Sequence, residues 1–196
     1  MSSISIHQFR VAAVAKVICD NFKLKIDSKN VILACLYHDM GNIIKFDLNY
    51  FPEFTKPEGL EYWQKVKDEY VQKYGHDEHL ATEIIAKEIG LPTPAFRYLH
   101  EIGFSKLDRT AETQSFEIKI CAYADMRVGP HGVISIEERL TDGKKRYAGR
   151  KHAIAGDNFE KFAQALRAIE QQIFSNTTIR PEEINDDKIS PIFNTF

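Results

Sequence analysis

The sequence lacks the features that mark membrane, secreted and polyanion-binding proteins. No run approaches the roughly 18 apolar residues that a membrane span needs. The opening residues, MSSISIHQFR, show no basic segment followed by an apolar stretch and a cleavage site. The formal net charge is −2, so no attraction to polymeric nucleic acid is expected. We therefore expect a soluble, cytoplasmic protein that contacts no membrane and no nucleic-acid polymer.

Cysteine is also scarce. The three cysteines, Cys19, Cys35 and Cys121, are widely separated, and each lies in an apolar pattern of helical spacing. This placement predicts small buried hydrophobic side chains rather than disulfides or a zinc site.

Strand signals are nearly absent, since no run of β-branched residues alternates with polar ones. Apolar residues recur instead at helical spacing, as Val11, Val14 and Ile18 do within residues 5–22. Further helices are predicted from Ser28 to the His38-Asp39 pair and over residues 58–74, 77–89, 94–103, 115–128, 135–148 and 156–174, with a break near Asp142-Gly143.

The hydrophobic content, 43% of 196 residues, is enough for one sizeable core. The predicted fold is a compact all-α helical bundle that forms a single domain over residues 1–175. Residues 176–196 are predicted to be a tail, which docks onto the body or contacts a partner such as a second copy of the chain.

Three of the predicted helices direct polar residues toward the same interior. His7 lies on the apolar stripe of the first helix, the His38-Asp39 pair ends the second, and Asp125 shares a row with Cys121 in YADMRV. Unpaired carboxylates are costly to bury, so a shared metal ion would explain the whole set.

Each of these residues has an ordinary explanation when it is taken alone. A histidine such as His7 on an apolar face is more often a hydrogen-bonded core residue. Asp125 would more often pair with an arginine, for example Arg127 or Arg10. The order of the residues and their common inward phase favour the metal.

The segments HQFRVA, YHDMG and YADMRV, taken together, resemble the HD-domain superfamily of metal-dependent phosphohydrolases over about residues 7–128. The resemblance implies an all-helical bundle in which His7, His38, Asp39 and Asp125 bind one divalent metal ion. A ligand set without thiolates suits Mn²⁺, Fe²⁺, Co²⁺ or Ni²⁺ and admits Zn²⁺.

Some members of this superfamily hold a second metal ion through two further histidines, with the aspartate of the pair as a bridge. The resemblance makes His76 and His100 the candidates here, with His79 as the alternative to His76. One or two ions are therefore expected. Asp39 would be the catalytic carboxylate that sets their spacing, and metal-activated hydroxide would be the nucleophile.

The resemblance implies a small phosphorylated substrate, for which a nucleotide is the favoured class. Arg127, Arg10 and Lys45 are the candidate phosphate-binding cations. Many relatives have lysine after the glycine of the pair, whereas this chain has Gly41-Asn42. The basic stretch at 143–152 is explained more simply as a solvated helix end.

Two other functions use the same ligands. A di-iron oxygenase would need all six His and Asp ligands and would consume O₂. A degenerate regulatory module would bind a nucleotide or a partner without turnover.

Overall fold

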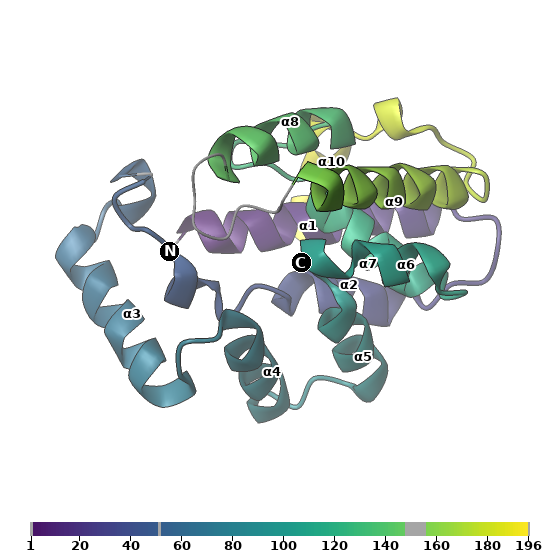
Figure 1. The fold of residues 1–196 in the computed structure, drawn as a ribbon. Coiled ribbons are helices and arrows are strands. Elements are labelled where there is room, and N and C mark those ends of the chain that lie inside the picture. The colour runs from purple at the N-terminus through teal and green to yellow at the C-terminus, as the bar shows by residue number, and fades with distance from the viewer. Residues whose placement is uncertain (1, 51, 148–155, 196) are drawn as a thin grey trace.

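The computed structural model describes residues 2–50, 52–147 and 156–195, and in these ranges the chain forms helices and no β-strand (Figure 1). The predicted all-α fold is confirmed. The α-helices are α1 (Ser2–Asp20), α2 (Ser28–Tyr37), α3 (Leu60–Tyr74), α4 (Glu78–Glu88), α5 (Thr93–Glu101), α6 (Leu107–Glu112), α7 (Phe116–Met126), α8 (Ile136–Tyr147), α9 (Gly156–Phe174) and α10 (Asp186–Ile189). The 3₁₀ helices are η1 (Asn42–Lys45), η2 (Pro52–Thr55), η3 (Phe104–Lys106), η4 (Pro181–Glu183) and η5 (Ser190–Thr195).

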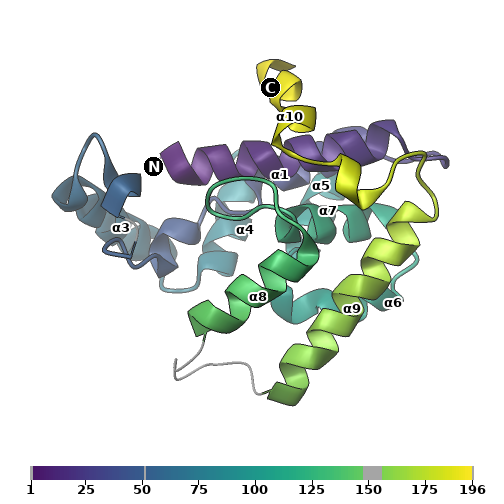
Figure 2. The same cartoon turned by 90° about the horizontal axis from the view of Figure 1, so that it is seen from above.

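Helix α1 contacts several other helices. Both α2 and α7 pack against it, and α10 contacts it from the C-terminal end of the chain (Figure 2). Val11, Val14 and Ile18 are fully buried, as their spacing predicts. The metal-ligand candidates on α1, α2 and α7 therefore come from helices that touch one another.

Local sequence signals account for several helix boundaries. The side chains of Asp27, Asp77 and Ser115 accept hydrogen bonds from backbone N–H groups in the first turns of α2, α4 and α7. Gly75 ends α3 with φ at +88°, a conformation that favours glycine.

One local prediction is wrong, and one helix was not predicted. Helix α8 continues through Asp142 and Gly143, where a break is predicted. One glycine costs a helix only about 1 kcal/mol, which packing readily offsets. The short helix α6 has no counterpart among the predicted elements.

The tail docks onto the body. Ile184 and Ile189 are buried in the main hydrophobic core, and Thr177 forms a backbone bridge with Phe22 beyond the end of α1. Residues 176–195 are thus packed as part of the bundle.

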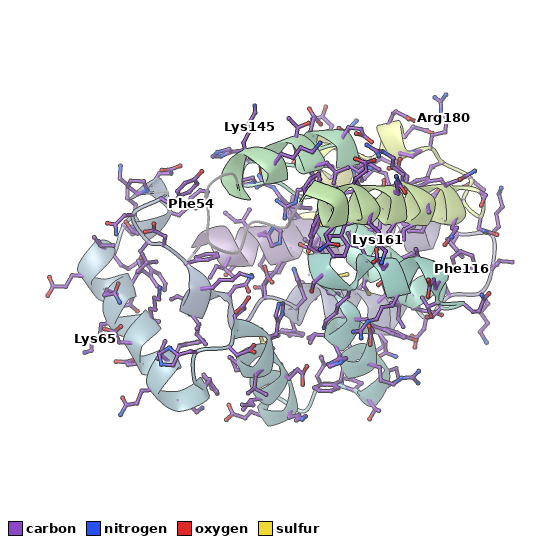
Figure 3. The ribbon with its side chains drawn as sticks, viewed as in Figure 1. Phe54, Lys65, Phe116, Lys145, Lys161 and Arg180 are labelled. Atoms are coloured by element: carbon purple, nitrogen blue, oxygen red, sulfur yellow. The ribbon has the colours of Figure 1, made fainter. Side chains whose placement is uncertain are left out.

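The basic stretch is described only in part, since residues 148–152 lie outside the described residues. Its described lysines, Lys144 and Lys145, are exposed, and Lys145 points away from the body (Figure 3). Among the helices that the structure describes, none combines the length and the apolar character of a membrane span.

A second, smaller hydrophobic cluster lies beside the core. Ile43 and Ile44 of η1 pack with Ala81 of α4, and side chains of α3 cover them. All residues of α3 keep some exposure, and this helix lies at the edge of the molecule (Figure 1). The segment that follows His38-Asp39 therefore anchors α3 and α4.

Gly41 permits the close approach between this segment and α4. Its N–H donates to Thr82 Oγ1 at 2.9 Å. A Cβ at position 41 would lie 2.4 Å from the carbonyl oxygen of Glu78 and 2.9 Å from the Ala81 Cβ. Neither contact can be relieved without moving the backbone of α4.

We expect Gly41→Ala to lower the free energy of unfolding by about 2 kcal/mol, because the added methyl group overpacks the contact with α4. Urea denaturation would measure the change. The matched control is Gly143→Ala within α8, where the nearest atom to a new Cβ lies at 3.8 Å. That control should leave stability unchanged or raise it by up to about 1 kcal/mol. Equal effects of the two substitutions would contradict the packing explanation.

Candidate metal centre

The His38-Asp39 pair occupies the turn that ends α2. His38 caps the helix and keeps a helical backbone. Its Nδ1 donates to the carbonyl oxygen of Cys35 at 2.8 Å, which fixes the ring orientation. The side chain is only 3% exposed, and its Nε2 has no hydrogen-bond partner among the described residues. The ring therefore presents one buried nitrogen to the interior.

Four side chains meet at this nitrogen. His38 Nε2 lies 3.4 Å from both Asp39 Oδ1 and Asp125 Oδ1. His7 Nε2 lies 3.2 Å from Asp125 Oδ1 and 3.5 Å from Asp39 Oδ2. Each imidazole thus lies between two carboxylates, although the four residues come from three separate segments of the chain.

The two carboxylates control the charge of the site. Burial lowers the pKa of His38, but the negative charges of Asp39 and Asp125 outweigh it and raise this pKa to about 10. Burial raises the pKa of Asp125, but its close contacts with His38 at 3.4 Å and His7 at 3.2 Å hold this pKa well below the usual range. In the metal-free protein a proton thus supplies the positive charge that the carboxylates require.

This arrangement could hold a metal ion. Ligand atoms of His7, His38 and Asp39 lie within 4.8 Å of one another, and Asp125 contacts both histidines. Imidazole nitrogens combined with carboxylate oxygens suit a divalent transition metal. The alternative in which Asp125 pairs with Arg127 or Arg10 is wrong, because the Asp125 carboxylate contacts the two histidines.

The candidates for a second metal ion lie apart from this centre. His76 and His100 are exposed, and within the described ranges neither belongs to a group of three or more closely spaced His, Cys, Asp or Glu side chains. His100 Nδ1 instead lies 2.5 Å from Glu83 Oε1. His79, the alternative to His76, has a side chain that is 57% exposed. A second metal site stays a prediction without support from this geometry.

The structure contradicts a substrate-binding role for Arg127. The residue is 4% exposed, and its guanidinium donates to Tyr123 Oη and to three backbone carbonyl groups. A buried guanidinium with its donors occupied is not available to a phosphate. The sequence places Arg127 two residues after Asp125, but it does not show in which direction the Arg127 side chain points.

Lys45 and Arg10 stay predictions for phosphate binding. Lys45 is 45% exposed and lies 3.3 Å from Glu78. Arg10 pairs with Asp186, whose Oδ1 lies 3.8 Å from the Arg10 Nε, and this Nε has no hydrogen-bond partner among the described residues. Glu83 and Asp186, the acidic partners of His100 and Arg10, carry no sequence signal because they are distant along the chain.

Comparison with known proteins gives one match. The family model described as HD domain matches residues 4–125, which is more than half of the chain and includes His7, His38, Asp39 and Asp125. No curated protein and no solved structure matches the chain.

The raised pKa of His38 predicts how the stability of the metal-free protein depends on pH. The stabilisation from protonated His38 is fully present below pH 6.5, the ordinary pKa, and is lost as the pH rises through about 10. We expect the free energy of unfolding of chelator-treated protein to fall across this window. Urea titrations at a series of pH values would measure it, with His38→Gln as the comparison that lacks this slope. Identical slopes for the two proteins would show that His38 does not titrate as described.

Proposed function

The chain belongs to the HD domain family, and from this membership we propose that it is a metal-dependent phosphohydrolase acting on a small phosphorylated compound of the nucleotide class. The observation that carries the proposal is the meeting of His7, His38, Asp39 and Asp125 around the buried His38 Nε2. A structural role alone gives no reason to gather two carboxylates and two imidazoles at one point.

The residues fit one divalent transition metal ion. His7, His38, Asp39 and Asp125 would hold it, because two imidazole nitrogens and two carboxylate oxygens converge where His38 Nε2 lacks a partner. When bound, such an ion lowers the pKa of a coordinated water to about 7 and supplies hydroxide at neutral pH.

Asp39 is the proposed catalytic carboxylate. One of its oxygens faces His38 and the other faces His7, so its loss would disturb both sides of the centre. The hydrogen bond from His38 Nδ1 to Cys35 keeps the imidazole oriented while the opposite nitrogen binds.

Arg10 is the stronger of the two remaining candidates for phosphate binding. Side chains on a helix lean toward its N-terminus, so the Arg10 guanidinium leans toward the turn that carries His7, three residues earlier. Its side chain is 22% exposed, and its ion pair with Asp186 is long, with 3.8 Å between Arg10 Nε and Asp186 Oδ1. Lys45, by contrast, lies against Glu78. A bidentate guanidinium also suits a phosphate better than an ammonium group does.

The di-iron oxygenase has no comparable support, because two of its six ligands, His76 and His100, are exposed and apart from the centre. The regulatory module uses the same four ligands as the hydrolase. The hydrolase would turn over its substrate, whereas the regulatory module would bind a ligand without turnover.

Metal analysis and phosphate release would test the proposal. Protein purified without chelator and without an affinity metal should bind about one equivalent of Mn²⁺ or Co²⁺ and release phosphate from some member of a nucleotide panel. EDTA should abolish release, and added metal should restore it. Asp39→Asn should lower activity more than about 100-fold, beyond the roughly 10–100-fold typical of residues that only hydrogen-bond to a metal ligand.

The control is Asp20→Asn, which changes an exposed aspartate at the other end of α1 that pairs with Lys16. It should bind metal and release phosphate as the wild type does. If the wild-type protein binds no metal after incubation with Mn²⁺, Fe²⁺ or Ni²⁺, the proposal that it is a metal-dependent enzyme is refuted. Metal and nucleotide binding without turnover would identify the regulatory module, and a need for iron and O₂ would identify the oxygenase.

A further inference from the structure

Arg127 joins the C-terminal segment to the helix that carries Asp125. Its Nη2 donates to the carbonyl oxygen of Ile184 at 2.9 Å, and its Nη1 donates to Pro181 O at 3.2 Å and to Tyr123 Oη at 2.7 Å. Its Nε donates to Ile134 O at 2.5 Å. One buried cation thus holds α7, the segment after it and the tail.

Asp186 provides a second attachment a few residues farther along the tail. Its two carboxylate oxygens accept from the Val133 N–H at 3.3 and 3.1 Å. It fits closely against Gly132, where a Cβ would lie 2.4 Å from Asp186 Oδ2. The same carboxylate forms the ion pair with Arg10 on α1.

We call residues 180–189 the C-terminal clasp. It begins at Arg180, whose side chain projects away from the body (Figure 3), and it runs beside α1 to α10 (Figure 2). It is attached to α7 two residues after Asp125 and to α1 three residues after His7. The clasp lies outside residues 4–125, the part of the chain that matches the family model.

Both ligands need such support because they lie close to helix ends. Asp125 is in the last turn of α7, which ends at Met126, and His7 is in the second turn of α1, which begins at Ser2. Terminal turns open more easily than helix centres because they have fewer backbone hydrogen bonds. A metal centre requires its ligands to be held within about 0.5 Å of the productive geometry.

We propose that the C-terminal clasp positions Asp125 and His7 for metal binding, with Arg127 and Asp186 as the positioning residues. This inference rests on the proposed metal centre. Neither residue contacts the metal or the substrate. Each acts by fixing the helix turn that carries a ligand.

Cobalt binding would test the clasp directly. Titration of chelator-treated protein with Co²⁺ gives a Kd, and the visible absorption of the complex reports the ligand geometry. Residues that hydrogen-bond directly to a metal ligand typically change affinity about 10–100-fold, and the clasp residues act less directly. We therefore expect Kd to rise about tenfold in Arg127→Lys and about threefold in Asp186→Ala. One lysine ammonium cannot replace four hydrogen bonds of a planar guanidinium. The absorption bands should change in both variants.

The matched control is Arg167→Lys. Arg167 makes two hydrogen bonds to Glu137 on the exposed faces of α9 and α8, at 2.7 and 2.9 Å. This variant should keep the wild-type Kd and spectrum even if its melting temperature falls. Circular dichroism at the titration temperature would verify that each variant is folded. The Asp186 side chain is 55% exposed, so we expect Asp186→Ala to fold. If Arg127→Lys does not fold, the Kd and spectrum of Asp186→Ala test the clasp.

The outcomes separate the two proposals. If the wild type binds Co²⁺ and the folded clasp variants keep its Kd and spectrum, the positioning role of the clasp is overturned and the proposed metal centre stands. An equal loss of affinity in Arg167→Lys also overturns it, because the effect then follows general stability. Absence of Co²⁺ binding by the wild type overturns the proposed function and the clasp together.

Discussion

The convergence of two carboxylates on two imidazoles is the constraint on which the rest of this structure depends. Asp39 and Asp125 are mostly buried, and Asp125 would be destabilising there without a positive partner. Protonated His38, whose pKa is raised to about 10, supplies that charge in the metal-free protein, and a divalent cation would supply more of it. Because the partners come from α1, α2 and α7, these helices must meet at one point.

The segments around this point serve to hold it. The carbonyl group of Cys35 orients His38, and Gly41 lets the following turn lie directly against α4. On the opposite side, Arg127 ties the end of α7 to the tail through backbone carbonyl groups. Arg127, a candidate for substrate binding from its sequence position, therefore holds the scaffold together, and Arg10 and Lys45 stay predictions for phosphate binding.

Some features of this structure could be predicted from the sequence, and others could not. Helical periodicity such as that of Val11, Val14 and Ile18 was enough to predict most helices, because it is a local signal. The break near Gly143 is wrong because a weak local preference was overridden by packing. His76 and His100 were placed by family resemblance alone, and their exposure gives a second metal no support here.

By itself the sequence determined the all-α class, the central place of His7, His38, Asp39 and Asp125, and the family to which they belong. Those properties follow from spacing along single helices and from short motifs, both of which can be read within a few turns of chain. Only the tertiary structure decided that Arg127 faces the tail, that Asp186 reaches Arg10 and that His100 pairs with Glu83. These contacts join residues from separate segments, and the direction of a long polar side chain depends on which acceptors the folded chain brings within reach.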